Sequence, residues 1–137
     1  MKTLFLVSPI GDDGSDVRIR ANLIMRHLIE PAVRLASHEY DLVRADTISQ
    51  PGNISNDVIR YLFKSEIVIA DLTNHNPNVM YEVAIRHARK KPCILLSTTS
   101  KDIPFDIAPE RTITIPQDLM DRDARRLCFE ELLQADH

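Results

Sequence analysis

Four polar side chains that could serve a reaction centre lie close together in the chain: Asp71, Asn76, Asn78 and Glu82. They follow the apolar run 67–70 (IVIA), whose consecutive β-branched residues are typical of a strand buried on both faces of a parallel sheet. In open parallel sheets, ligands bind where loops leave the carboxyl ends of the strands. Two carboxylates and two amides at such an edge therefore predict an active site.

The segment after this strand is expected to be a polar turn followed by a helix. Asn76 is a suitable helix cap, and Pro77 suits the first helical position because its missing N–H costs nothing there. Glu82 then lies about one and a half turns inside the helix, and Asn78 lies one turn before it on the same face. This arrangement lets Glu82 turn back over the edge of the sheet if it shares the face of Asn78.

The rest of the chain alternates strands and helices. Strands are expected at 3–8, 41–46, 67–71, 92–98 and 112–115, and helices from about 16, from about 55, from 77 to 90 or 91, and over 122–134. The first helix is long, with Pro31 as a possible kink and four arginines largely outside its apolar face, which comprises Ala21, Ile24, Met25, Leu28, Pro31 and Leu35. The second helix is expected to turn Val58, Ile59, Leu62 and Phe63 inward.

This alternation, joined by right-handed crossovers, predicts one α/β domain over residues 1–137. The expected architecture is a three-layer flavodoxin-like domain with a five-stranded parallel sheet in the order 2-1-3-4-5. Its switch point lies between strands one and three. There the loop 8–15 meets the loop 71–78, which brings the richest polar segments of the chain into one crevice.

Composition excludes several classes of protein. With 44% hydrophobic and 27% charged residues, the 137-residue chain is typical of a soluble globular protein. Its net charge of −3 argues against nucleic acid as the main partner. Cys93 and Cys128 are predicted to be free and buried, and no cysteine spacing suits a metal. The first apolar run is too short for a signal peptide or membrane span, so we expect a cytoplasmic protein that needs no membrane, metal or cofactor.

Each reactive candidate also has a plainer interpretation. Glu82 precedes Arg86 by four residues and could form a solvated ion pair with it. Asp71 could bond the backbone of its own loop. Asn76 is expected to be a cap in any case, and His75 is interpreted as a solvated loop residue rather than an acid.

Two phosphate chemistries fit the sequence less well. Gly11 and Gly14 lack the ending of a P-loop, and the acidic residues of that loop would repel phosphate unless Arg18 or Arg20 offsets them. A phosphoacceptor receiver domain shares the strand order, with Asp12, Asp13, Asp71 and Thr98 as superficial matches. However, the acidic pair comes four residues after the strand, and the turn 116–118 has no lysine to contact an acyl phosphate.

Four segments carry a resemblance to a known family: LFLVSPIGDDGSDVRIR, VRAD, IVIADLTNHNPNVMYEVAIRHA and IPFDI. Together they resemble nucleoside 2-deoxyribosyltransferase-like domains and the related TIR-like nucleotide-binding proteins of bacteria, over nearly the whole chain. The most specific part is ADLTNHNPNVMYEVAIRHA, because the family places a catalytic glutamate on the helix after strand three. That residue corresponds to Glu82.

The resemblance implies cleavage or transfer at the N-glycosidic bond of a nucleoside, a nucleotide or NAD. Such a reaction passes through an oxocarbenium-like state, which a carboxylate against C1′ can attack or stabilise. The implied catalytic residues are Glu82 and Asp71, and the implied substrate-binding residues are Ser8, Pro9, Ile10, Gly11, Arg18, Asp46, Asn76, Asn78 and Phe105. The expected partners are this small molecule and further copies of the chain. The alternative is a non-catalytic nucleotide-sensing or TIR-like self-association module.

Overall fold

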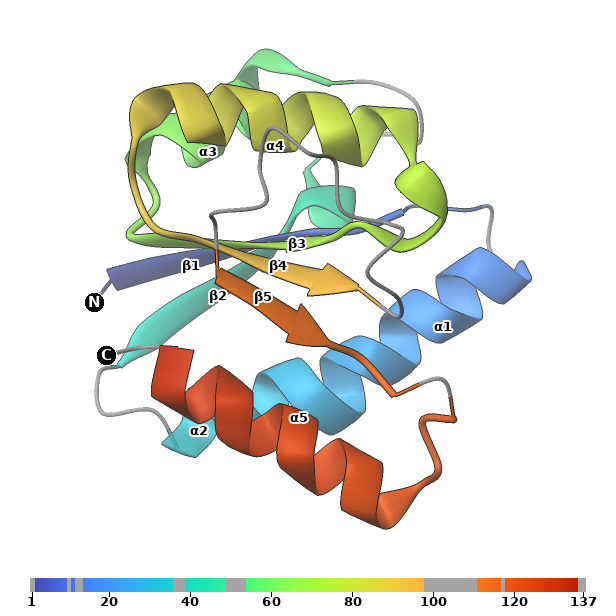
Figure 1. Ribbon diagram of the computed structural model, residues 1–137. Helices are drawn as coiled ribbons and strands as arrows, with labels where there is room; N and C mark the ends of the chain where they lie inside the picture. Colours follow the sequence, from blue (N-terminus) through green and yellow to red (C-terminus); the bar gives the residue numbers. More distant parts are fainter. Residues whose placement is uncertain are drawn as a thin grey trace.

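A parallel sheet of five strands, in the order β2-β1-β3-β4-β5, forms the centre of the fold (Figure 1). The computed structural model describes residues 2–9, 11, 14–35, 39–48, 54–97, 111–116 and 118–135. The strands are β1 (Lys2–Val7), β2 (Tyr40–Arg44), β3 (Ile67–Asp71), β4 (Cys93–Ser97) and β5 (Arg111–Thr114). The flavodoxin-like order expected from the sequence is confirmed, and the strand ends differ from expectation by a residue or two.

Helices cover both faces of this sheet and give a three-layer domain (Figure 1). One face carries α3 (Asn56–Lys64) and α4 (Pro77–Arg89). The other carries α5 (Arg122–Ala135) and a long helix built from α1 (Asp16–Ile24), the π-helical segment η1 (Met25–Ile29) and α2 (Glu30–Leu35). Two short 3₁₀ segments, η2 (Ala45–Thr47) and η3 (Thr73–His75), follow β2 and β3 at the carboxyl edge.

Alternating side chains of the strands divide the core into two parts. In β1, Phe5 and Val7 pack with the α3 and α4 layer, whereas Leu4 and Leu6 pack with the α1 and α5 layer. All five residues of β3 are buried, as expected for a central strand covered on both faces. The cysteines follow the same division, because Cys93 lies in the first part and Cys128 in the second. Both cysteines are buried and neither forms a disulfide, as predicted.

Side-chain caps set the starts of three helices. The hydroxyl oxygen of Ser15 accepts a hydrogen bond from the Arg18 N–H at 3.2 Å, and Ser55 does the same for Val58 at 3.2 Å. Asn76 caps α4 with Pro77 in the first turn, as predicted. These caps fix where α1 and α4 begin at the carboxyl edge, which is where the candidate site lies.

Two expected core residues are exposed. Leu35 is 67% exposed and Phe63 is 47% exposed, so the prediction that both face inward is wrong. Phe63 follows the buried Leu62, and adjacent residues of an α-helix point in different directions. Leu35 comes after the π-helical segment, whose wider turn shifts later residues out of the α-helical periodicity. This segment ends two residues before Pro31, whose ring would clash with the His27 carbonyl in a regular α-helix.

Candidate functional site

The loops after β1 and β3 meet at the carboxyl edge of the sheet. Val7 of β1 pairs with Ala70 of β3, so the next residues, Ser8 and Asp71, lie at the same end of neighbouring strands. The prediction that these two residues share one edge is confirmed. This edge, at the right of Figure 1, is also where α1 and α4 begin.

The β1–α1 loop approaches α1 closely at Gly11. A Cβ atom added there would lie 2.3 Å from the Ser15 hydroxyl oxygen and 3.0 Å from Val17 Cβ, so a side chain does not fit. Pro9 is buried, and Ser8 and Gly11 are half-buried. The Gly11 carbonyl accepts a hydrogen bond from Arg18 Nε at 3.2 Å. The missing side chain of Gly11 thus lets this loop lie against the first turn of α1. Its carbonyl holds the Arg18 side chain at the edge of the sheet.

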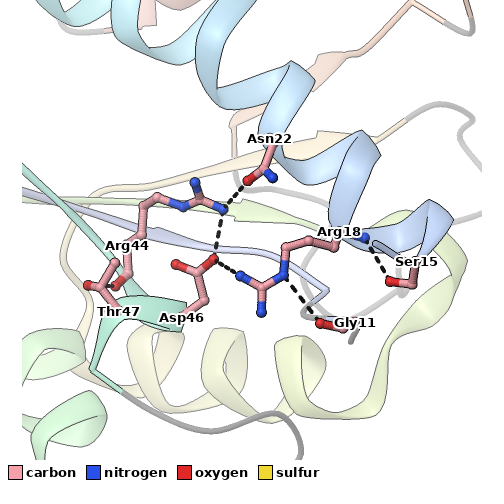
Figure 2. A network of polar contacts seen from close by, with 7 residues as sticks. All are labelled: Gly11, Ser15, Arg18, Asn22, Arg44, Asp46 and Thr47. Atoms are coloured by element: carbon pink, nitrogen blue, oxygen red, sulfur yellow. Dashed lines mark hydrogen bonds and ion pairs between the residues drawn. The ribbon is translucent and has the colours of Figure 1, made fainter. Parts of the chain in front are cut away.

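Asp46 joins three elements through two arginines (Figure 2). Its Oδ2 accepts hydrogen bonds from Arg18 Nη1 of α1 at 3.0 Å and from Arg44 Nη2 of β2 at 2.7 Å. Arg44 Nη2 also donates to Asn22 Oδ1 at 3.0 Å. The side chain of Asp46 is only 7% exposed, so its carboxylate is largely desolvated. Its second oxygen, Oδ1, is buried without a hydrogen-bond partner among the described residues.

Asp71 is fully occupied by groups of the protein itself. Its Oδ1 accepts hydrogen bonds from the Thr73 N–H at 3.0 Å and from the Thr73 hydroxyl at 2.6 Å. Its Oδ2 forms an ion pair with Arg20 Nη1 of α1 at 2.8 Å. Asp71 therefore bonds its own loop, as one sequence interpretation held, and also connects β3 to α1.

The β3–α4 loop carries two residues in the left-handed region, Asn74 (φ 60°) and His75 (φ 50°). Such angles are uncommon outside glycine and carry strain. The loop ends at Asn76, whose Oδ1 accepts hydrogen bonds from the backbone N–H groups of Asn78 at 3.0 Å and Val79 at 3.2 Å. Asn76 is thus occupied as a cap, whereas the half-buried Asn78 lies in the first turn of α4 with its backbone N–H capped.

Glu82 lies on the buried face of α4. The buried residues of this helix are Val79, Glu82, Val83 and Arg86, which recur at helical spacing and define one stripe. Glu82 is 6% exposed and forms no hydrogen bond or ion pair with the part of the chain that the structure describes. Burial raises the pKa of its carboxyl from 4.5 to about 7, because the charged form loses its water.

Arg86 does not pair with Glu82. It is fully buried, and its guanidinium donates to the carbonyls of Leu62 at 3.0 Å, Glu66 at 3.1 Å and Pro92 at 2.8 Å. It thereby fastens α4 to the end of α3 and to the segment before β4. The alternative of a solvated Glu82–Arg86 ion pair is wrong, since both residues are buried and Arg86 has other partners.

The structure brings most of the predicted site residues to one edge. Ser8, Pro9, Gly11, Arg18, Asp46, Asp71, Asn76 and Asn78 belong to the ends of β1, β2 and β3 or to the helix starts beside them, and Glu82 follows one turn after Asn78. Ile10 and Phe105 lie outside the described residues.

Sequence reasoning did not assign Arg20, Arg44 or Asn22 to the site. Arg44 and Asp46 stand two apart at a strand end, and such spacing often puts residues on one side of a strand. That signal could have found Arg44. The partners of Arg20 and Asn22 lie far away in the chain, so spacing gives no sign of them.

No group of three or more His, Cys, Asp or Glu side chains within the described residues is placed to hold a metal ion. None of the described helices is long and apolar enough to cross a membrane.

The fold resembles several solved structures. A 2-deoxyribosyltransferase from Leishmania mexicana matches with a TM-score of 0.52 and 18% identity, over 72% of this chain and 66% of that enzyme, just under two thirds of its length. A conserved protein from Enterococcus faecalis V583 matches with a TM-score of 0.58 and 16% identity, over 98% of this chain and 99% of that protein. An oxidoreductase from Corynebacterium diphtheriae matches with a TM-score of 0.51 and 11% identity, over 99% and 93% of the two chains.

Sequence comparisons gave no family. No protein-family model matches the chain, and no curated protein matches it. At these identities, the structural similarities establish the flavodoxin-like fold alone.

Proposed function

We propose that this protein binds a nucleoside, a nucleotide or NAD at the carboxyl edge of its sheet and cleaves or transfers the N-glycosidic bond, with Glu82 acting at C1′. One observation carries the proposal. Glu82 is a buried carboxylate without a hydrogen-bond or ion-pair partner among the described residues, on the helix that begins at the switch point. The fold similarity to a 2-deoxyribosyltransferase and the sequence around Glu82 support the same reaction class.

The environment of Glu82 suits a group that acts on developing positive charge. Breaking the C1′–N bond gives an oxocarbenium-like transition state, and a nearby carboxylate stabilises it or forms a covalent bond to C1′. In the free protein, desolvation holds the Glu82 pKa near 7. A cationic transition state supplies the missing partner, so the interaction strengthens as the reaction proceeds.

The hydrogen bonds and the ion pair of Asp71 favour substrates with a good leaving group. Both of its oxygens bind Thr73 or Arg20, so this carboxylate holds the β3–α4 loop and α1 in place. Such a group contributes by positioning and is badly placed to protonate a leaving base. Nicotinamide leaves without an acid because it is already cationic, and this favours NAD over nucleosides whose bases need protonation.

Release of free base from a panel of nucleosides, nucleotides and NAD tests the proposal. We expect chromatography to show one class of compound cleaved, and Glu82→Gln to lower the rate by several orders of magnitude while ligand binding stays near that of the wild type. The matched control is Glu130→Gln on the exposed side of α5, which should leave the rate unchanged. Equal rates for Glu82→Gln and the wild type would refute the role of Glu82.

A second candidate is a non-catalytic nucleotide-sensing or self-association module. The bonded carboxylate of Asp71 favours this module, because Glu82 is then the one member of the predicted catalytic pair that can act on a substrate. Tight binding of a nucleotide to the wild type without release of base from any compound would support this module.

A further inference from the structure

A second polar surface lies at the amino edge of the sheet, opposite the candidate site (left in Figure 1). Both α3 and α4 end at this edge, and Arg89 Nε donates a hydrogen bond to the Phe63 carbonyl at 3.3 Å. This contact brings the two helix ends together. The basic residues that gather there define the basic surface: Arg60, Lys64, His87, Arg89, Lys90 and Lys91.

Two hollows open on the basic surface. The first has a volume of about 270 Å³, lies at the end of α3, and is lined by Thr3, Arg60, Tyr61, Lys64 and Ser65. The second has a volume of about 540 Å³, lies at the end of α4, and is lined by His87, Ala88, Lys90, Lys91 and Pro92. Each hollow therefore has cations around a space that a side chain of another molecule can enter.

The fold has little need of these cations. Lys64, Lys90 and Lys91 form no ion pair with the described residues. Basic side chains often stabilise the negative end of a helix, but the buried Arg86 already donates to three backbone carbonyls at this edge. Satisfying the helix ends therefore does not account for three further lysines.

Lys90 has a backbone conformation that favours glycine. It is the C-cap residue of α4, with a φ of 58° in the left-handed region, where a side chain costs free energy. Glycine at this position would end the helix with less strain. The chain instead has an exposed ammonium group here, on the lining of the larger hollow. A strained residue of this kind points to function rather than to stability.

We propose that the basic surface binds an acidic segment of another protein, with carboxylates in the two hollows and an apolar side chain against Phe63. Phe63 is 47% exposed and directly precedes Lys64, so apolar area adjoins the cations. Glutamate and aspartate side chains match the lysine charges and reach into the hollows. Because this surface lies at the edge opposite the candidate site, the inference goes beyond the proposed function and stands without it.

Shape and charge favour a protein segment over other polyanions. Side chains of a peptide can enter the hollows, whereas the headgroups of a lipid bilayer lie in one plane. Nucleic acid carries a charge on every nucleotide, and the net charge of this chain is −3. Asp57, which pairs with Arg60, and Glu66, which closely follows α3, would repel such a continuous backbone. A peptide avoids this repulsion because its carboxylates can be spaced to meet the cations alone.

Fluorescence anisotropy with a labelled peptide tests this binding. The probe is a fluorescein-labelled peptide with glutamates on both sides of one phenylalanine, and its matched control carries glutamine in place of every glutamate. We expect only the acidic peptide to bind at low salt. Its dissociation constant should rise as salt is added, because ions screen exposed charges.

Lys90→Gly separates binding from stability. It removes the ammonium group and relieves the left-handed backbone, so the thermal midpoint should stay equal or rise while the dissociation constant increases about 2- to 5-fold. Lys64→Gln and Lys91→Gln should each weaken binding to a similar degree, and the triple variant by about 10- to 100-fold. The matched control is Arg126→Gln, an exposed cation on α5 beyond the other face of the sheet, which should leave the affinity unchanged.

Several results would overturn the inference. These are equal binding of the acidic and glutamine peptides, wild-type affinity in the triple variant, and tighter binding of oligothymidylate or of vesicles containing phosphatidylserine. Concentration-dependent association of the protein that Lys90→Gly abolishes would assign the surface to a second copy, and would also overturn it. Release of base by Lys90→Gly should equal that of the wild type, so the two proposals succeed or fail separately.

Discussion

Replacing Glu82 by glutamine should stabilise the protein at alkaline pH. Glu82 is buried, no described residue pairs with its carboxyl group, and its folded-state pKa is about 7 compared with an ordinary value of 4.5. Glutamine has nearly the same shape and cannot ionise. Above pH 7 the wild type must bury a charge that the variant does not carry, so the variant should have the larger free energy of unfolding.

The pKa difference sets the size and sign of this effect. Between pH 4.5 and 7 the folded state binds more protons than the unfolded state, so wild-type stability falls as the pH rises through this window. The difference between 4.5 and about 7, at 1.36 kcal/mol per unit, gives a cost of about 3 kcal/mol at pH 8. At pH 5 the cost is about 1 kcal/mol. The gain on substitution should therefore be about 2 kcal/mol larger at pH 8, whatever the amide itself costs to bury.

Urea unfolding at pH 5 and pH 8 measures this quantity. Far-UV circular dichroism is a suitable signal, because the chain has three tyrosines and no tryptophan. The control is again Glu130→Gln, an exposed glutamate whose loss should change stability by less than about 0.5 kcal/mol at either pH. An equal change for Glu82→Gln at both pH values would refute the reasoning, and a loss of stability that grows with pH would show that the carboxylate has a cationic partner.

Three further predictions concern the same helix. Arg86→Met should lower the free energy of unfolding by at least about 3 kcal/mol, since three carbonyls lose their donor, and an unaltered urea midpoint would contradict this. Arg86→Ala is thus expected to disrupt the fold and cannot serve as a mild control for activity. Asn76→Ala should lower the free energy of unfolding by about 1 kcal/mol through loss of the cap, and an unchanged thermal unfolding midpoint would contradict this. If Glu82 acts as nucleophile or ion-pair stabiliser, kcat/KM should rise with pH through about 7, and a fall over that range would indicate a general acid instead.

Local sequence signals were sufficient for the fold. The apolar strand 67–71, the Asn76-Pro77 helix start and the serine caps each act over a few residues, so they are visible in the sequence. Together with the rule for right-handed crossovers, they also placed the loops after β1 and β3 at one edge. The alternative that pairs Glu82 with Arg86 was wrong because i,i+4 spacing describes neighbours on an exposed helix surface, and this face of α4 is buried.

The contacts that define the site act over long separations. Arg20 reaches Asp71 across 51 positions, and Arg86 reaches Leu62 across 24. No periodicity encodes such pairs, since they follow from how α1 and α3 lie against the sheet. The exposure of Leu35 was missed for another reason: Pro31 predicted a disturbance of the helix, but not the π-helical segment that alters the helical register before Leu35.

The contrast between the three carboxylates at the edge is the strongest physical argument for function. Asp71 has a donor on each oxygen, and Asp46 has two arginines on one of its oxygens. The chain can therefore supply partners to acidic groups here. Of these three, Glu82 alone has no partner in the part of the chain that the structure describes, and burying its charge costs about 3 kcal/mol in alkaline solution. A cost of this size is a large part of the stability of a small domain, so a group that bears it needs a compensating role. A bound ligand with positive charge at C1′ would provide that role, because it would turn the cost into binding energy for the transition state.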